Sequence, residues 1–330
     1  MSKPIIAVTM GDPASVGPEV AAKALARGEV WDCCRPLLVG DARVMAKAVA
    51  LLDTPLALRA IAEAGDARFD PAAPDVLDLG NVDLGSLELG RVSAAAGRAS
   101  VDYIERAMKL AQAGQVDAIA TGPINKAALK AAGVPFIGHT ELLAALTGEE
   151  RVTTMLATPG LRVVHVTRHV SLADVAKHIT RENVLETTRL TDVGLKQMGI
   201  PAPRLAVAAL NPHGGDDGLM GREEIEAIGP AVEAARAEGI DAHGPIPADS
   251  VFFRAIRGEF DAVIAMYHDQ GHIPIKTHGF ERSVTVTLGL PVVRTSVDHG
   301  TAFDIAWQGV AHEESMVEAV CLAAQLVSGR

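Results

Sequence analysis

Short, almost uninterrupted apolar runs alternate along this chain with longer amphipathic segments. We predict strands at 5–10, 36–39, 118–121, 153–157, 162–167, 205–210, 262–267 and 283–288. We predict helices at 18–26, 93–113, 171–179, 182–198, 223–237 and 314–328. Strands that are apolar on both faces and separated by helices are typical of a mainly parallel sheet covered on both sides. The sequence therefore predicts an α/β fold, with short edge strands and irregular connections between 53 and 91.

The length and composition predict two lobes rather than one. The chain has 330 residues, of which 48% are hydrophobic and only 3% aromatic, so Ala, Val, Leu and Ile must build the core. We find no internal repeat and no Gly/Ser linker, which favours two lobes within one continuous chain. The net charge of -11 argues against binding to nucleic acid. A small anionic substrate needs only a few local cations.

The cysteines and the N-terminal segment predict a cytoplasmic protein. Cys33 and Cys34 are adjacent and poorly placed to pair with each other, and Cys321 makes the number odd, so we expect reduced thiols. The first apolar stretch, of about six residues, is too short for a secretory signal. No window holds the roughly 18 apolar residues of a membrane helix. We expect no membrane partner.

Each of three predicted strands is followed by a histidine: His169, His213 and His268. In open α/β sheets ligands bind outside the carboxyl ends of the strands. Three imidazoles there could supply the protein ligands of a catalytic metal and leave one position open. The alternative is that each histidine caps its strand or bonds its own loop. His169 is a better candidate than His165, which lies inside its strand.

Two carboxylates lie near these histidines in the sequence, Asp249 and Asp269. Either could orient a ligating imidazole through its second nitrogen, or form a turn.

A second group of residues suits an anionic substrate. Gly138 precedes a predicted helix on which Thr140 is a plausible N-cap, and the free amides there would make His139 and Thr140 a site for a phosphate or carboxylate. Lys276 and Arg294 follow strand-like segments, and either could neutralise a phosphate. Simple capping and surface charge are the alternatives.

No standard dinucleotide or nucleotide fingerprint is present. The glycine-containing segments 11–18 and 121–126 each follow a strand, but neither has the spacing of a Rossmann or Walker loop. A nicotinamide cofactor would therefore need a different binding loop.

Six motifs, in this order, resemble those of the 4-hydroxythreonine-4-phosphate dehydrogenase family of vitamin B6 synthesis. They are Gly11-Asp12-Pro13, TGPINK at 121–126, GHTE at 138–141, LNPH at 210–213, MYHDQG at 266–271 and RTSVDHGT at 294–301. The resemblance covers nearly the whole chain. It implies two α/β/α lobes around a cleft, as in isocitrate and isopropylmalate dehydrogenases. The expected lobes are 1–128 with 297–330 on the cofactor side, and 129–296 with metal, substrate and dimer contacts.

The resemblance also assigns roles to single residues. It implies a homodimer with shared sites, in which His169 and His213 bind the metal together with His268 from the partner subunit. The implied substrate-binding residues are His139, Thr140, Lys276, Thr285 and Arg294. The implied cofactor-binding residues are Gly289, Asp298, His299, Gly300 and Thr301. Residues 298–306 resemble an adenosine-binding loop in which a glycine usually follows; here that position is Trp307.

Several residues depart from the vitamin-pathway pattern. Thr285 replaces a usual asparagine, Ser15 replaces a usual glycine, and the segments 165–169 and 271–276 are more similar to paralogues. We expect metal-dependent, NAD(P)-linked oxidation of a phosphorylated hydroxy acid such as 4-phosphohydroxy-L-threonine. The alternatives are 4-phospho-D-erythronate and a cyclic dihydrodiol. We expect NAD, because no cluster for a 2′-phosphate is evident, and zinc, with magnesium, cobalt or manganese as alternatives.

The expected chemistry needs a base for the substrate hydroxyl, whose pKa a divalent ion would lower. Lys276, Asp249 and Asp269 are the candidates, and the sequence does not choose between them. Loss of carbon dioxide from a β-keto acid product is a further expectation. A metal-dependent lyase or hydrolase, and a binding protein without catalysis, are the competing hypotheses.

Overall fold

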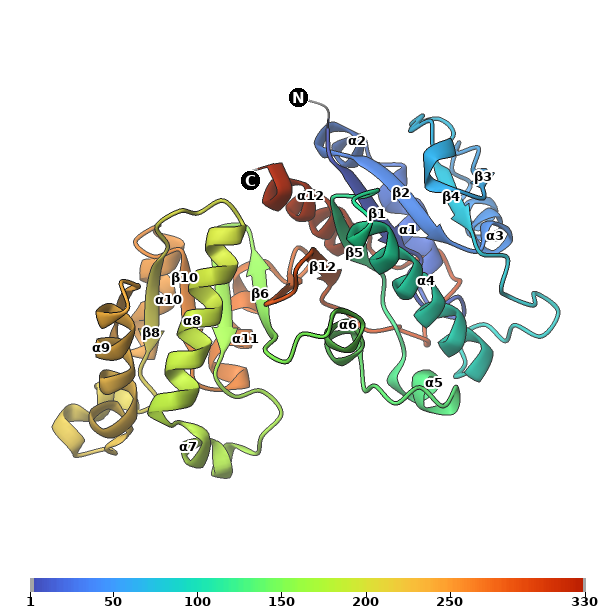
Figure 1. Ribbon diagram of the computed structural model, residues 1–330. Helices are drawn as coiled ribbons and strands as arrows, with labels where there is room; N and C mark the ends of the chain where they lie inside the picture. The colour runs from blue at the N-terminus through green and yellow to red at the C-terminus, as the bar shows by residue number, and fades with distance from the viewer. Residues whose placement is uncertain (1–2, 329–330) are drawn as a thin grey trace. The chain divides into compact units, whose positions relative to one another are not determined.

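The computed structural model describes residues 3–328, which form two compact units (Figure 1). Unit 1 comprises the chain up to Glu150 together with Leu290–Ser328, and unit 2 comprises Arg151–Gly289. Residues 129–150 and 290–296, which we placed in the second lobe, thus pack with unit 1. The chain passes from unit 1 to unit 2 and back again, so unit 1 is built from two separate segments of the sequence.

Unit 1 contains six parallel strands in the order β3-β4-β2-β1-β5-β12. Their bounds are β1 (Ile5–Thr9), β2 (Arg35–Gly40), β3 (Arg59–Ile61), β4 (Asp75–Asp78), β5 (Ala118–Thr121) and β12 (Val293–Val297). The chain runs outward from β1 through β2 and then returns to β5 on the other side of β1. Ligands of open α/β sheets bind at such a reversal, outside the carboxyl ends of the two strands.

Helices cover both faces of this sheet (Figure 1). The unit-1 helices are α1 (Gly17–Leu25), α2 (Gly28–Cys33), α3 (Ala42–Leu52), α4 (Ala94–Gln112), α5 (Lys126–Ala131), α6 (His139–Thr147) and α12 (Glu314–Ser328). Helix α1 packs against α3 and α12, while α4 packs against α5 and against β1, β2 and β5. Local sequence fixes several helix starts: the side chains of Asp41, Ser93 and Asn125 accept backbone N–H groups at the starts of α3, α4 and α5.

Unit 2 contains six strands in the order β11-β6-β7-β10-β8-β9. Their bounds are β6 (Thr153–Thr158), β7 (Leu161–His165), β8 (Arg204–Ala208), β9 (Asp241–Ile246), β10 (Ala262–Ala265) and β11 (Val284–Leu288). Strands β7, β10, β8 and β9 are parallel, while β6 runs antiparallel to both β7 and β11. The parallel part brings the carboxyl ends of these four strands to one edge.

The unit-2 helices also lie on both faces of their sheet. They are α7 (Val175–His178), α8 (Arg181–Gln197), α9 (Gly229–Ala237), α10 (Ala248–Ile256) and α11 (His268–Gly279). Helix α8 packs with α9 across β7, β8, β10 and β11, whereas α10 and α11 contact β7 and β10. One buried cluster joins α10 and α11 to the strands, with Val163, Val251, Phe252 and Ile275 among its members.

The predicted α/β class is confirmed, and all eight predicted strands are present within two residues of their expected ends. Two predicted helices are less regular than expected: 171–179 divides into a 3₁₀ turn (Leu172–Asp174) and α7, and 223–237 begins with a π-helical turn (Glu224–Ile228). Within residues 3–328, no helix is long and apolar enough to cross a membrane.

Candidate active site

The three predicted metal-binding histidines follow three neighbouring strands of unit 2. His169 follows β7, His213 follows β8 and His268 begins α11 directly after β10. Because β10 pairs in parallel with both β7 and β8, the three carboxyl ends lie side by side at one sheet edge. The prediction of a shared metal site required these three strand ends to be adjacent.

Of the three imidazole rings, those of His169 and His268 lie near each other. The His169 and His268 ring centroids are 6.3 Å apart. His213 is exposed on a 3₁₀ turn (Pro212–Gly218), where its φ of 54° lies in the left-handed region. Among residues 3–328 of one chain, no group of three His, Cys, Asp or Glu side chains is arranged to hold a metal ion. Within the described residues, the three predicted ligands are therefore not gathered around one point.

Two further histidines surround His268. His272, one helical turn along α11, stacks on His268 with centroids 3.5 Å apart and planes 11° apart. His165 lies 4.7 Å from His272, is 3% exposed, and has no hydrogen-bond partner at Nε2. A side chain at Gly271 would meet that nitrogen at 2.2 Å, so the glycine allows the packing. The sequence argument set His165 aside as a strand residue, and it is indeed the last residue of β7.

The donor set fits a divalent transition metal in its chemistry. Nδ1 of His268 lies 2.6 Å from Oδ1 of Asp269, which leaves Nε2 of His268 for a ligand. Neutral imidazole nitrogens suit zinc, which takes three protein ligands in catalytic sites. Asp249 is an exposed residue in the first turn of α10. Of the two carboxylates, Asp269 is the one hydrogen-bonded to a predicted ligand.

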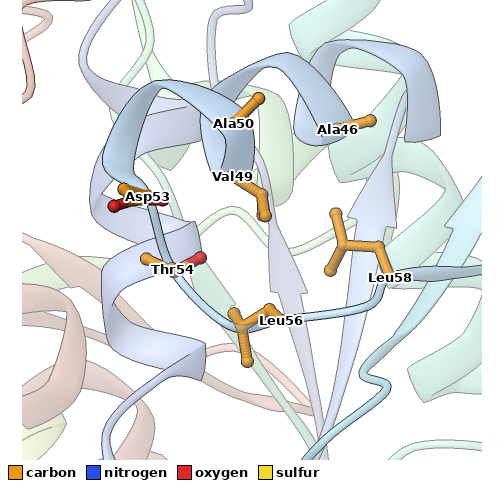
Figure 2. A pocket seen from close by; sticks show the side chains of 7 residues that line it. All are labelled: Ala46, Val49, Ala50, Asp53, Thr54, Leu56 and Leu58. Carbon is orange, nitrogen blue, oxygen red and sulfur yellow. The ribbon is translucent and has the colours of Figure 1, made fainter.

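A polar pocket of about 450 Å³ adjoins His169. It is lined by Val166, Thr167, Arg168, His169, Val170, His178, Asn183, Glu186 and Thr187. Arg168 and His178 give it cationic or potentially cationic groups. A different pocket in unit 1, of about 290 Å³, is lined by Ala46, Val49, Ala50, Asp53, Thr54, Leu56 and Leu58 (Figure 2). It contains no predicted site residue.

Lys276 and Thr285 complete the predicted substrate-binding residues of unit 2. The Lys276 ammonium lies 3.0 Å from the hydroxyl of Ser283 and 4.8 Å from the centre of the Phe280 ring. Thr285 is half-buried in the middle of β11, opposite Leu156 of β6.

Two residues of unit 1 that were predicted to bind an anion, His139 and Arg294, lie close enough for the charge of Arg294 to act on the imidazole. Arg294 is 3% exposed, and its Nε donates to the hydroxyl of Thr121 at 3.1 Å. Burial lowers the pKa of the Arg294 guanidinium to about 9. His139 begins α6, and its buried Nε2 has no hydrogen-bond partner. Burial, followed by the charge of Arg294, holds the pKa of His139 well below its usual value.

Thr140 is the second residue of α6 and is half-buried. The predicted N-cap role belongs instead to Gly138, and no side-chain cap bond is formed. The prediction is therefore wrong by two positions, because Thr140 already lies inside the helix. The sequence analysis gave Thr121 no role of its own, although its segment, 121–126, is one of the six motifs; in the structure its hydroxyl accepts a hydrogen bond from Nε of Arg294.

Sequence reasoning also missed a buried carboxyl at the reversal between β1 and β5. Asp12 follows β1, is fully buried, and donates its backbone N–H to Pro123 O at 2.9 Å. Its Oδ1 accepts the Ala14 N–H at 2.8 Å, while Oδ2 has no hydrogen-bond partner. Burial raises the pKa of Asp12 to about 6, although the Ala14 N–H acts in the opposite direction. At Gly11, φ is 77° and a Cβ would lie 2.6 Å from Pro123 O, so the two loops touch there.

The predicted cofactor loop follows β12 in unit 1. The Thr301 carbonyl accepts the Val16 N–H at 3.2 Å, and its hydroxyl accepts from Asn125 at 3.1 Å. Nδ1 of His299 lies 2.9 Å from the Gly300 carbonyl. These contacts place residues 298–301 beside the loops that end β1 and β5, where a dinucleotide is expected in open α/β sheets. Gly289, which belongs to unit 2, has φ 91° and would clash with Arg151 O if it carried a Cβ.

Comparison with known proteins gives one family. The family described as "Pyridoxal phosphate biosynthetic protein PdxA" matches residues 32–323. D-Threonate 4-phosphate dehydrogenase from Cupriavidus necator is 51% identical over 328 residues, which cover 99% of this chain and 98% of that protein.

Solved structures agree with this result. A 4-hydroxythreonine-4-phosphate dehydrogenase from Burkholderia phymatum is 48% identical with a TM-score of 0.89, covering 99% of each chain. A second such enzyme, from Klebsiella pneumoniae, is 46% identical with a TM-score of 0.91, covering 98% of this chain and 99% of its own. A terephthalate 1,2-cis-dihydrodiol dehydrogenase from Burkholderia xenovorans is less similar, at 33% identity and a TM-score of 0.67, over 98% of both chains.

Proposed function

The chain belongs to the PdxA family of pyridoxal phosphate biosynthetic proteins, and on that premise we propose that it is an NAD-linked dehydrogenase of a four-carbon, 4-phosphorylated hydroxy acid. The observation that carries the proposal is the 51% identity, over 99% of this chain, to a D-threonate 4-phosphate dehydrogenase. D-Threonate 4-phosphate and 4-phospho-D-erythronate differ only in configuration at carbon 2, and both are within the proposed class. Thr285, in place of the asparagine usual in the vitamin-pathway enzymes, favours these acids over 4-phosphohydroxy-L-threonine.

In this proposal His139, Thr140 and Arg294 hold the phosphate. Arg294 is a buried cation beside the neutral imidazole of His139, whose free Nε2 offers a further polar contact. A buried guanidinium is stabilised by a paired anion and offers several donors in one plane. Such contacts contribute orientation, which can be worth several kcal/mol in the reaction step.

The metal-binding residues in this proposal are His169, His213 and His268, with His268 acting across a homodimer. Support for the dimer comes from large apolar side chains exposed on α10, on α11 and directly after α11: Phe253 is 61%, Ile273 62% and Phe280 69% exposed. His268 is the first residue of α11, so an interface on this helix would carry the imidazole to a neighbouring subunit. When bound, a zinc ion supplies Lewis acidity, which lowers the pKa of a coordinated hydroxyl and stabilises negative charge on its oxygen.

Lys276 is the proposed base of this reaction. Asp269 is hydrogen-bonded to His268, which suits an orienting role, and Asp249 is exposed on a different helix. Lys276 lies between Ser283 and the face of Phe280, so the position of its Nζ atom is fixed by two contacts. In this assignment Nζ is a neutral amine when it takes the hydroxyl proton and becomes an ammonium, and the hydroxyl of Ser283 keeps that nitrogen in place.

Residues 298–301 would bind the adenosine part of NAD, with Thr301 fixed by Val16 and Asn125. Oxidation of the carbon 3 hydroxyl would transfer a hydride to the nicotinamide and leave a β-keto acid. That acid can lose carbon dioxide and leave a three-carbon ketone phosphate. We include this decarboxylation in the proposed reaction.

The proposal is tested by a substrate panel with NAD⁺ or NADP⁺ and zinc, followed by absorbance of the reduced nicotinamide. The panel contains D-threonate 4-phosphate, 4-phospho-D-erythronate, 4-phosphohydroxy-L-threonine and a cis-dihydrodiol. We expect the highest kcat/KM with one of the first two acids and NAD⁺, and loss of turnover in His213→Ala. A preference for the unphosphorylated diol would contradict the phosphate site. Absence of turnover with every compound would contradict the dehydrogenase assignment.

A further inference from the structure

Trp307 ends the predicted cofactor loop in a backbone conformation that large residues rarely adopt. Its φ is 61°, in the left-handed region that favours glycine. Its backbone N–H donates to the carboxylate of Glu19, and its indole Nε1 donates to Pro13 O at 3.2 Å. The surrounding structure therefore holds both the backbone and the ring of this residue.

Glu19 is a fully buried carboxylate, and both of its oxygens accept backbone N–H groups from the turn at 307–309. It lies in the first turn of α1 and has 0% exposure. One oxygen accepts the N–H of Trp307, and the other accepts the N–H of Gly309 at 2.7 Å. A buried carboxylate needs such donors, and a charged acceptor makes stronger hydrogen bonds than a neutral one.

The next turn of α1 continues the same contact. Lys23, four residues after Glu19, donates to the carbonyls of Gly309 and Ala311 at 2.9 and 2.5 Å. One face of α1 therefore binds the backbone of 307–311 through a carboxylate and an ammonium.

The start of the cofactor loop is held by the residues that precede α1. Val16 N–H donates to Thr301 O at 3.2 Å, and Asn125 donates to the Thr301 hydroxyl. Residues 13–23 thus contact both Thr301 at the beginning of the loop and Trp307–Gly309 at its end. These contacts hold the loop at both ends, and a loop held in this way loses less conformational entropy when it binds a ligand.

We propose that Glu19 is a positioning residue for the dinucleotide, and that it acts by holding Trp307 in the left-handed conformation that closes the cofactor loop. The inference rests on the proposed function, because it takes residues 298–301 as contacts of the adenosine group. It identifies α1 as the element that pre-organises this loop. It also explains how the chain accommodates a tryptophan where a glycine is usual.

The first test compares Glu19→Gln with Glu29→Gln, an exposed glutamate paired with Arg27. A glutamine directs an amide donor at one of the two backbone N–H groups, so one of the two bonds is lost. We expect the Kd for NAD⁺, measured by calorimetry, to rise at least about tenfold, or about 1.4 kcal/mol. The KM for the phosphorylated acid and the affinity for zinc should stay within about twofold. Glu29→Gln should match the wild type in all three.

A second substitution separates positioning from a general structural role. Trp307→Gly removes the need to hold a bulky residue at positive φ, so Glu19→Gln/Trp307→Gly should bind NAD⁺ within about threefold of Trp307→Gly alone. The inference is overturned if Glu19→Gln binds NAD⁺ as tightly as the wild type. It is also overturned if the affinities for NAD⁺, substrate and zinc fall in parallel, or if the double variant shows no rescue.

Tryptophan fluorescence gives a readout that does not require a Glu19 variant to fold. The chain has two tryptophans, Trp31 and Trp307, so Trp31→Phe leaves Trp307 as the only reporter. NADH should quench its emission and show sensitised emission of its own. A Trp31→Phe protein that turns over but shows no quenching would overturn the inference and leave the proposed function intact. A wild type that binds neither NAD⁺ nor NADP⁺ would overturn the proposed function itself.

Discussion

Nδ1 of His268 lies 2.6 Å from Oδ1 of Asp269, the residue that follows it in the chain. A hydrogen bond of this kind fixes the orientation of an imidazole and raises the basicity of its second nitrogen. It therefore bears on two roles that the sequence left open for Asp269, a catalytic base and a residue that orients a metal ligand. The two roles give different results on mutation.

We expect Asp269→Asn to weaken zinc binding by about 10- to 100-fold in competition with a chelator, because a neutral amide orients His268 less well. Turnover should return to near the wild-type level at saturating zinc. The matched control is Asp241→Asn, which alters an exposed pair of the same kind, His243 Nε2 to Asp241 Oδ1 at 2.8 Å. A variant that binds zinc normally but has lost kcat would identify Asp269 as the base instead.

Arg294→Lys tests the phosphate site. Lysine keeps a positive charge but lacks the planar fork of the guanidinium, and it would be buried beside Thr121 without matching its contacts. We expect the KM for the phosphorylated substrate to rise at least about tenfold with a smaller change in kcat. The control is Arg98→Lys, at an exposed ion pair with Asp102. An unchanged KM would remove Arg294 from the binding site.

The fold was largely predictable from the sequence because most strands are apolar on both faces. Two strands that we did not predict, β12 in unit 1 and β9 in unit 2, show the limit of that signal. β12 is Val-Arg-Thr-Ser-Val, so its buried residues include Arg294, Thr295 and Ser296, which are polar. β9 contains a Gly-Pro step and pairs with β8 through an irregular register. Both strands are specified by their neighbours rather than by their own hydrophobicity.

The site was predictable in its topology but not in its geometry. The positions of His169, His213 and His268 after strands placed them at one edge, since β7, β10 and β8 are adjacent. Sequence patterns do not fix the loop conformations that aim the rings, such as the left-handed backbone of His213. Asp12 was overlooked because an aspartate between Gly and Pro reads as a turn residue, and only its burial distinguishes it.

The thiols of Cys33 and Cys321, on α2 and α12, lie 2.7 Å apart, and both cysteines are free. We expect glutathione disulfide to oxidise them to an intramolecular disulfide, with loss of two hydrogens from the protein. A cross-link between residues so far apart in the chain restricts the unfolded state and typically stabilises a protein by about 2–4 kcal/mol. The oxidised protein should therefore have a higher Tm, reversed by a reductant. Cys34→Ser should behave as the wild type and Cys321→Ser should show no shift; a shift in Cys321→Ser would contradict the assignment.

The buried carboxyl of Asp12 predicts a distinctive dependence of stability on pH. Burial raises its pKa from 3.8 to about 6 in the folded protein. Below about pH 4 the carboxyl is protonated in both the folded and the unfolded state, so its titration does not change the free energy of unfolding. Between about pH 4 and pH 6 the folded protein keeps a proton that the unfolded chain releases, and stability falls as the pH rises. Above about pH 6 the loss is complete, at about 3 kcal/mol for a difference of roughly two pKa units.

Asp12→Asn removes this titration. Denaturant titrations at several pH values give the unfolding free energy of each protein. Relative to Asp12→Asn, the wild type should lose up to about 3 kcal/mol of unfolding free energy between pH 4 and pH 6, and the difference should stay constant above pH 7. Carboxylates with lowered pKa values, such as Asp41 and Glu224, change the stability with pH in the opposite direction. Both proteins contain these groups, so their contribution cancels in the difference. Asp32→Asn, at an exposed position, should show no such trend. A flat difference for Asp12→Asn would mean that burial does not raise the pKa of Asp12 above its value in the unfolded chain.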